Sequence, residues 1–310
     1  MSDTRVRVLT AAKELSYRPN LTARSLRSGR TNSIGLIIPE LSLSYFAELA
    51  DLVLRAADKR GLSVLIEQTN GERSRELQTI SSPRMTLTDG VIFSPLGMGM
   101  EDAEALDVSY PLVILGERVF GGPTDHVTMR NVEAAHAATR FLLQSGRTRI
   151  AVLGAHPDEK VGSAALRLEG YRAALAEAGI PFDPQLVVET TLWHRSNGAS
   201  AMHELLQRRC DFDAVFGLND TLALGGMRVL QESGRRVPAD VSVIGFDNLD
   251  EAAYSLPTLT TIEPGRSEIA EVAVASLVER MSGMTSNPRE FRTEFSIVER
   301  ESAPGSALRH

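Results

Sequence analysis

The sequence predicts an α/β protein with two doubly wound, parallel-sheet lobes and a short N-terminal helical arm. From Ser33 onward, short apolar runs of strand length alternate with helical patterns, which is typical of parallel sheets covered on both faces. The chain has 310 residues, and a single hydrophobic core rarely serves a chain of that length. Two lobes are therefore expected behind the arm.

Each lobe is predicted to contain one series of alternating strands and helices. In the first series, strands are expected at residues 33–38, 62–66, 90–93 and 111–115, and helices near 44–60, 73–82 and 131–145. In the second series, strands are expected at 149–153, 186–188, 213–216 and 241–246, and helices near 163–179, 196–208, 219–233 and 266–282. Helices should therefore cover both faces of each sheet.

The N-terminal arm is basic, whereas the rest of the chain is acidic. Residues 1–30 carry seven Arg or Lys side chains against two carboxylates, a formal charge of +5, and residues 31–310 carry −12. This division suits a protein that touches a polyanion only with its arm. Chance asymmetry at a chain terminus is the alternative.

The arm contains a short helix that needs a partner. Pro19 ends the first helix of the arm, Asn20 can cap the next, and Gly29 stops it about two turns later. Isolated helices below roughly 12–15 residues are marginal in water. Arginines surround Leu26, and the minor groove of DNA accepts both arginines and an apolar wedge. A solvated linker with no DNA role is the alternative.

These arm residues and the alternating pattern behind them resemble the LacI/GalR family of bacterial transcriptional repressors over nearly the whole chain. The resemblance implies a periplasmic-binding-protein-like pair of lobes, and it identifies the short helix as a hinge helix that orders on operator DNA. It also implies that Leu26 wedges into the central base step and that Ala23 and Arg24 lie along the minor groove. Asn20 and Arg27 complete the predicted DNA-binding set.

The resemblance further implies how the chain is divided between the lobes. In this family the chain crosses three times, so that the helix near 266–282 returns to the first lobe and the strand near 293–299 to the second. The expected units are 1–30 for the arm, 31–145 plus 266–291 for the N-terminal lobe, and 146–265 plus 292–302 for the C-terminal lobe. Periodicity alone does not show these crossings.

The start of the chain differs from the family pattern. A helix through Val6, Leu9 and Leu15 has an apolar stripe, and the resemblance implies that it is the third helix of a DNA-binding headpiece. The helix-turn-helix that would read the major groove is not in the sequence. A start codon placed internally, at a GTG, and a deliberate truncation both stay open. Weak, salt-dependent and poorly selective DNA binding through residues 1–30 is expected.

A ligand is expected at the carboxyl ends of the strands, in the cleft between the lobes. Aromatic rings at the start of the first-lobe helix can face it, and the resemblance implies contacts from an arginine, an acidic residue after a strand and a tryptophan. Carboxylates and amides accept hydrogen bonds from vicinal hydroxyls, which suits sugars and nucleosides. The predicted ligand-binding residues are Tyr45, Phe46, Arg167, Trp193, Asn219, Asp220 and Asp247.

Most of these residues have a structural alternative. Tyr45 and Phe46 would then pack in the core, Arg167 would form a surface ion pair, and Asp220 and Asp247 would cap helices or turns. If Arg167 serves only the ligand, its truncation to alanine should leave the folded state nearly intact.

Two departures from the family pattern bear on specificity. The family often has Asp-Asn before the crossover helix, whereas this chain has Arg130-Asn131. After the strand LTTI many relatives carry a glutamine or aspartate, and here Glu263 follows it. Arg130 either favours an acidic effector, such as a sugar acid or phosphate, or faces solvent. The effector therefore stays open.

Enzyme classes lack their signatures in this sequence. There is no G-x-S-x-G, no H-E-x-x-H, no Walker loop and no G-x-G-x-x-G after the first strand. Five scattered histidines without metal spacing are expected to be surface or packing residues: His126, His136, His156, His194 and His203. The lone Cys210 indicates a reducing cytosol, and no apolar run is long enough for a membrane span. Binding without turnover, cofactor or metal is expected.

The sequence therefore predicts a cytoplasmic, homodimeric repressor that senses a sugar-like effector between its lobes and couples this to operator binding. A stand-alone small-molecule binding protein of the same architecture is the alternative. For the dimer, Leu49, Leu52, Val53 and Ala56 provide a first-lobe surface, with core packing as the alternative. The operator sequence, induction or corepression, and dimer or tetramer stay open.

Overall fold

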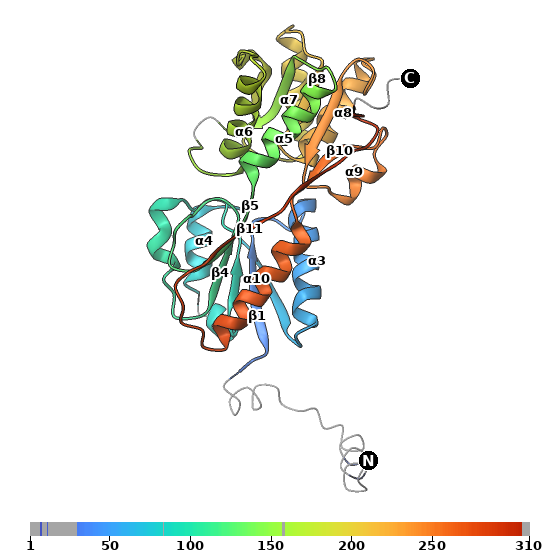
Figure 1. Ribbon diagram of the computed structural model, residues 1–310. Helices are drawn as coiled ribbons and strands as arrows, with labels where there is room; N and C mark the ends of the chain where they lie inside the picture. The colour runs from blue at the N-terminus through green and yellow to red at the C-terminus, as the bar shows by residue number, and fades with distance from the viewer. Residues whose placement is uncertain (1–6, 8–10, 12–29, 83, 157–158, 306–310) are drawn as a thin grey trace.

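Two α/β lobes, one above the other in Figure 1, make up the described part of the chain. The computed structural model describes Arg7, Ala11 and residues 30–82, 84–156 and 159–305. Each lobe contains one predominantly parallel sheet flanked by helices, which confirms the predicted fold class. The predicted DNA-binding residues lie outside the described residues: Asn20, Ala23, Arg24, Leu26 and Arg27.

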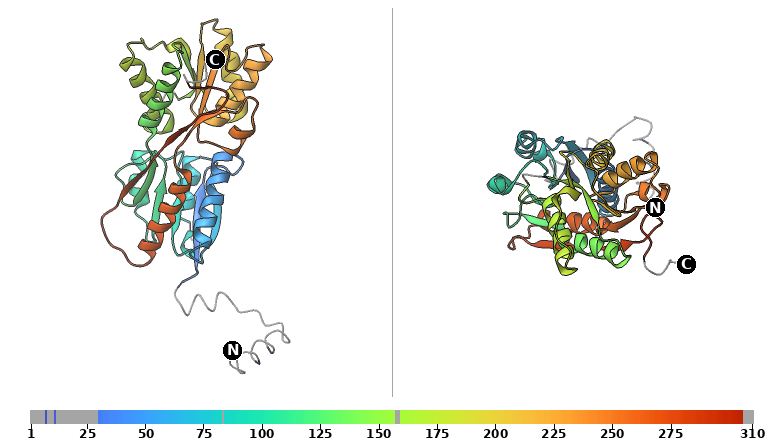
Figure 2. Two further views of the ribbon diagram at one scale, coloured as in Figure 1. Left: turned by 45° about the vertical axis from the view of Figure 1, so that its right-hand side comes forward. Right: turned by 90° about the horizontal axis from the view of Figure 1, so that it is seen from above.

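The first lobe has a six-stranded sheet in which all neighbouring strands are parallel, in the order β11-β5-β4-β3-β1-β2. Its strands are β1 (Ser33–Ile38), β2 (Ser63–Gln68), β3 (Val91–Phe93), β4 (Leu112–Leu115), β5 (Asp125–Met129) and β11 (Glu290–Thr293). Its helices are α3 (Ser44–Asp58), α4 (Arg73–Ile80), η1 (Met85–Leu87), η2 (Met100–Leu106) and α10 (Arg266–Met281). Helices α3 and α10 lie side by side in Figures 1 and 2.

The second lobe has a six-stranded sheet in the order β12-β10-β9-β8-β6-β7, parallel except for the antiparallel pair of β12 and β10. Its strands are β6 (Ile150–Ala155), β7 (Val187–Glu189), β8 (Ala214–Gly217), β9 (Ser242–Phe246), β10 (Thr260–Glu263) and β12 (Ser296–Val298). Its helices are α5 (Asn131–Gln144), α6 (Ser163–Glu177), η3 (Pro184–Leu186), α7 (Arg195–Gln207), α8 (Asp220–Glu232) and α9 (Asp250–Tyr254).

Helix α5 belongs to the second lobe, so the expected boundary at residue 145 is misplaced. It packs along α6 and also contacts β8, β10 and β12. The close packing depends on Gly170 of α6, where an added Cβ would lie 2.2 Å from the carbonyl oxygen of Val132. The chain therefore first crosses between lobes at Arg130, directly after β5.

The other two crossings run next to each other. One joins β10 to α10 through Gly265, and the other joins β11 to β12 through Glu294. Gly265 has a φ of +80°, and a Cβ added there would lie 2.7 Å from the carbonyl oxygen of Glu294. Glycine satisfies both the positive φ and the close approach of the two segments.

The apolar face of α3 lies in the core of the first lobe. Leu49, Val53 and Ala56 are fully or almost fully buried, and Leu52 packs at the edge of the same core. The prediction that these residues form a dimer surface is therefore wrong, because α3 uses them to cover the sheet beside α10.

Strands β5 and β11 were not among the predicted strands. Asp125 at the start of β5 is fully buried and pairs with Arg280 of α10 at 2.5 Å and with Arg289 before β11 at 2.7 Å. Although burial acts to raise it, the hydrogen bonds from these arginines lower the pKa of Asp125 to about 2. This three-residue cluster fixes the returning segment onto the edge of the first sheet.

No helix in the described part of the chain is long and apolar enough to span a membrane.

Candidate ligand-binding site

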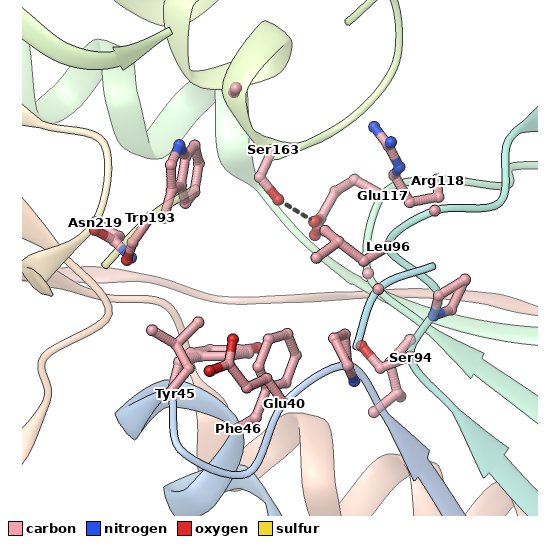
Figure 3. A pocket seen from close by; sticks show the side chains of 18 of the residues that line it. Glu40, Tyr45, Phe46, Ser94, Leu96, Glu117, Arg118, Ser163, Trp193 and Asn219 are labelled. Atoms are coloured by element: carbon pink, nitrogen blue, oxygen red, sulfur yellow. Dashed lines mark hydrogen bonds between the residues drawn. The ribbon is translucent and has the colours of Figure 1, made fainter. Parts of the chain in front are cut away.

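A cavity of about 400 Å³ lies between the two lobes, within the size range of small-molecule sites. Most of its polar lining residues directly follow strands, because the carboxyl ends of both parallel sheets face the cleft. The lining includes Glu40 after β1, Ser94 after β3, Glu117 after β4, His156 after β6, Asn219 after β8 and Asp247 after β9. Figure 3 shows side chains from both lobes around this space.

Aromatic rings form opposite sides of the cavity. The rings of Tyr45 and Phe46 from α3 pack edge to face with centroids 5.1 Å apart. Trp193 lies across the space from them in Figure 3, held by a hydrogen bond from its Nε1 to the carbonyl oxygen of Gly154 at 2.9 Å. Burial raises the pKa of Tyr45 well above its ordinary value, so its hydroxyl stays neutral. Rings placed in this way can stack on the apolar face of a sugar.

A buried arginine and aspartate lie at the base of the cavity. Arg167 and Asp247 are each 3% exposed, and Nη2 of Arg167 lies 3.8 Å from Oδ1 of Asp247. Arg167 also donates to Oδ1 of Asn131 at 2.7 Å and to the carbonyl oxygen of Leu218, and its guanidinium stacks 3.6 Å from the ring centroid of Phe246. Burial raises the pKa of Asp247 to about 7, and the charges of Arg167 and Arg266 oppose that rise.

Glu117 connects the two lobes across the cavity. Its Oε2 accepts a hydrogen bond at 2.6 Å from the hydroxyl of Ser163, the first residue of α6, as Figure 3 shows. Its Oε1 accepts from the hydroxyl of Thr128 on β5 at 3.2 Å. The side chain is nearly buried, with 6% exposure.

A second carboxylate holds the loop before α6. Glu159 pairs with Nη1 of Arg118 at 3.3 Å and Nδ1 of His156 at 2.8 Å, and it accepts from the backbone nitrogen of Ala164 at 3.0 Å. Burial acts to raise its pKa, but the hydrogen bond from His156 and the charge of Arg118 leave the pKa of Glu159 below its ordinary value. Arg118 also donates to the carbonyl oxygen of Val161 at 3.0 Å, a contact between lobes.

Further polar contacts close the rim of the cavity. Glu40 after β1 lies 3.0 Å from Nε2 of His194 before α7. The hydroxyl of Ser44 at the start of α3 donates to Glu251 of α9 at 2.6 Å. These contacts hold the lobes together around the space, so a change in lobe separation would break them.

Known proteins of the same kind resemble this chain over most of its length. A family model described as a periplasmic binding protein-like domain matches residues 139–303. A solved structure of a LacI-family transcriptional regulator from Sanguibacter keddieii DSM 10542 is 49% identical, with a TM-score of 0.83, and the match covers 89% of this chain and all of that chain. The chain belongs to the LacI family.

Two other regulators are also similar to this chain over most of its length. This LacI-family chain is 31% identical over 299 residues to the HTH-type transcriptional repressor PurR of Vibrio atlanticus (strain LGP32), covering 96% of this chain and 89% of PurR. It is 34% identical over 308 residues to the HTH-type transcriptional regulator CelR of Thermobifida fusca, covering 96% and 89%. A CelR–cellobiose complex has a TM-score of 0.79 at 30% identity, covering 97% of this chain and 91% of that chain.

Six of the seven predicted ligand-binding residues line the cavity of this LacI-family protein: Tyr45, Phe46, Arg167, Trp193, Asn219 and Asp247. Asp220 does not, in contrast to the prediction. It is fully buried behind the cavity, where its carboxylate accepts from the hydroxyl of Thr261 at 2.5 Å and from the backbone nitrogen of Leu249 at 2.8 Å. Asn219 caps α8 by accepting from the backbone nitrogen of Leu222. Asp220 therefore joins α8 to the neighbouring strand and loop.

The two departures from the family pattern lie outside the cavity lining. Arg130 pairs with Glu294 at 3.0 Å, so the crossing segment holds this cation. Glu263 accepts from the backbone nitrogen of Gly265 at 2.9 Å and from Asn248 at 2.9 Å, which fixes the start of α10. The interpretation of Arg130 as a residue that selects an acidic effector therefore loses its basis.

Several lining residues were missed by sequence reasoning. Glu117 follows β4 directly, and the rule that ligands lie beyond the carboxyl ends of parallel strands would have found it. His156 and His194 were expected to be surface or packing residues, but both line the cavity. In the described ranges, no group of three or more His, Cys, Asp or Glu residues could hold a metal ion.

Proposed function

We propose that this protein is an effector-responsive transcriptional repressor. It binds a small polar ligand of the sugar type between its lobes, and this binding changes its affinity for operator DNA through the N-terminal arm. Membership of the LacI family supports the regulatory role, and the CelR–cellobiose complex supports a saccharide as the ligand class.

The observation that carries the ligand class is the lining of the cavity. Aromatic rings of Tyr45 and Trp193 lie on opposite sides of the space in Figure 3, and the carboxyl groups of Glu117 and Asp247 also line it. Sugars combine apolar ring faces with peripheral hydroxyl donors, which match stacked aromatics and carboxylate acceptors. A cavity of about 400 Å³ is large enough for a small saccharide and small enough to surround it.

The coupling to DNA rests on the contacts between the lobes. A ligand that touches both lobes stabilises the arrangement in which they are close, and it shifts the equilibrium only as far as its affinity differs between the open and closed arrangements. The hydrogen bond from Ser163 to Glu117 is one contact that such a ligand would join or replace. Movement of the first lobes within a dimer would change the separation of the two arms.

The test begins with thermal-shift screening of monosaccharides and disaccharides, followed by calorimetry on the compound that stabilises the protein most. Tyr45→Phe removes only the hydroxyl of an aromatic residue that lines the cavity. It should weaken binding by roughly two- to tenfold, the value of one neutral hydrogen bond. Tyr254→Phe is the matched control, because Tyr254 is 81% exposed on α9 and does not line the cavity.

The regulatory part is tested separately by fluorescence anisotropy on operator duplexes from the gene's own upstream region. The stabilising compound should change the operator dissociation constant of the parent protein. For Tyr45→Phe, the same change in the operator dissociation constant should require a correspondingly higher ligand concentration. A ligand that binds with no effect on DNA affinity would instead favour a binding protein without a DNA function.

A further inference from the structure

Carboxylates outnumber cations among the residues that line the cavity. The lining holds four carboxyl groups, from Glu40, Glu117, Glu159 and Asp247, and two guanidinium groups, from Arg118 and Arg167. Two histidines, His156 and His194, complete the set. Even with the carboxyl group of Asp247 protonated, the site is negative while the histidines are neutral, so it attracts cations and repels anions.

Both guanidinium groups of the lining lie against carboxyl groups, and Nε of Arg118 is buried without a hydrogen-bond partner among the described residues. Arg118 pairs with Glu159 at 3.3 Å, and Arg167 pairs with Asp247 at 3.8 Å while donating to Asn131 and Leu218. Neither guanidinium in the described lining therefore lacks a carboxylate partner. A phosphate or carboxylate on a ligand would have to break one of these pairs and leave a buried carboxylate behind.

One ring nitrogen of each histidine in the lining faces a carboxylate, whereas Nε2 of His156 is buried with no hydrogen-bond partner among the described residues. Nδ1 of His156 lies 2.8 Å from Glu159, and Nε2 of His194 lies 3.0 Å from Glu40. Neither histidine is therefore free of a carboxylate neighbour that would compete with an anionic ligand.

Glu117 is the exception among the carboxylates of the lining. Both of its hydrogen bonds come from hydroxyl groups, those of Thr128 and Ser163, and no cationic side chain of the described residues forms an ion pair with it. A carboxylate has about four lone-pair sites, so acceptor capacity remains on a group that is 94% removed from solvent. Burying a charge without a counter-charge is unfavourable.

We propose that the cavity prefers a saccharide that carries an ammonium group, which Glu117 binds, and that it rejects sugar acids and sugar phosphates. This inference rests on the proposed saccharide-sensing function and names the ligand class of the same site. A neutral sugar would exclude the remaining water from Glu117 and supply no counter-charge, whereas an ammonium group supplies both hydrogen bonds and charge. Glu117 is then the residue that determines specificity.

The test uses matched ligands related to glucose: glucose itself, glucosamine, gluconate and glucose 6-phosphate. Cellobiose and the β-1,4-linked dimer of glucosamine form the disaccharide pair. Dissociation constants are measured by calorimetry at one pH at which the amine is protonated. In the parent protein the aminated member of a pair should bind at least tenfold more tightly than the neutral member. Both anionic sugars should bind at least tenfold more weakly than glucose.

Glu117→Gln should reduce the affinity for the aminated member at least tenfold and bring its ratio to the neutral member close to one. Glu104→Gln removes an exposed carboxylate on η2, outside the cavity, and should leave the ratio unchanged. The ranking of ligands in the parent decides the question even if Glu117→Gln fails to fold. An anionic or neutral sugar that binds the parent as tightly as its aminated counterpart overturns the inference.

The outcomes separate this inference from the proposed function. If neutral saccharides bind and aminated ones bind no better, saccharide sensing stands and the role of Glu117 fails. If no saccharide binds, the proposed function fails. The charge preference of the cavity is then tested by thermal shift with two probes, the Tris cation, which is an aminated triol, and inorganic phosphate. Tris should then raise the melting temperature of the parent more than that of Glu117→Gln, and phosphate should not. Equal shifts for Tris overturn the inference.

Discussion

Asp247 provides a direct test of the electrostatics at the base of the cavity. Its carboxyl group is buried, and burial raises its pKa to about 7. Arg167 and Arg266 act against that rise, while the charges of Glu117 and Glu263 add to it. Asp247→Asn removes the titration and keeps the shape. Asparagine also tolerates the positive φ of +114° at this position better than most residues.

The sign of the effect follows from the two protonation states. Because the pKa of Asp247 is higher in the folded protein than its ordinary value of 3.8, the folded state holds the proton more tightly than the unfolded state does. Stability from this group is therefore fully present at low pH and is lost as the pH rises from about 4 to about 7. The full loss is about 4 kcal/mol, and about 2–3 kcal/mol of it falls between pH 5 and pH 8.

The assay is urea denaturation of the parent and of Asp247→Asn at pH 5 and at pH 8, followed by the fluorescence of Trp193, the single tryptophan. Distant carboxylates such as Asp125 titrate in the same way in both proteins, so their contributions cancel in the difference. The charge of Asp247 adds to the rise in the pKa of the buried Asp220, so Asp220 changes in the same direction and adds to the difference. The variant should gain about 2–3 kcal/mol relative to the parent on going from pH 5 to pH 8. A difference that does not change with pH, or that changes in the opposite direction, would refute the reasoning.

Other predictions follow from the buried ion pairs, the arm and the family. Arg167→Ala should lower the free energy of unfolding by about 3–5 kcal/mol, contrary to the expectation from sequence, and a loss below 1 kcal/mol in urea denaturation would contradict its structural role. Asp125→Asn should lower the free energy of unfolding by a similar amount, because Arg280 and Arg289 lose the carboxylate that they share. Since the pKa of Asp125 is lowered in the folded protein, the parent should lose this stability as the pH falls from about 4 to about 2. Affinity for operator duplexes, measured by anisotropy, should fall steeply with salt because residues 1–30 carry seven basic side chains; an affinity independent of salt would exclude the arm as the contact. Light scattering should give twice the 33.7 kDa chain mass at micromolar concentration, and a monomer at tens of micromolar would count against paired arms.

The sequence by itself determined the two-lobed α/β class and much of the site. Apolar runs of strand length and helical periodicity are local properties, and they locate elements without knowledge of their partners. Tyr45, Asn219 and Asp247 follow such strands closely. They could be placed at the cleft because the carboxyl ends of parallel strands share one edge of a sheet. The short strands β5 and β11 were missed, because they pair residues such as His126 and Glu290 that lie far apart in the chain, and because most of β11 is not buried.

Only the tertiary structure decided which polar residues face the ligand and which hold the fold together. Asn219 and Asp220 are neighbours with similar chemistry, yet one lines the cavity and the other is buried against Thr261. Helix α5 looks the same in sequence whichever lobe it joins, and its contact with Gly170 assigns it to the second. Arg130 lost its expected role in specificity because Glu294 neutralises it. Glu117, which the sequence analysis did not single out, lines the cavity, and no cation pairs with it among the described residues. Burial and charge pairing are set by contacts between distant segments, which a local pattern does not contain.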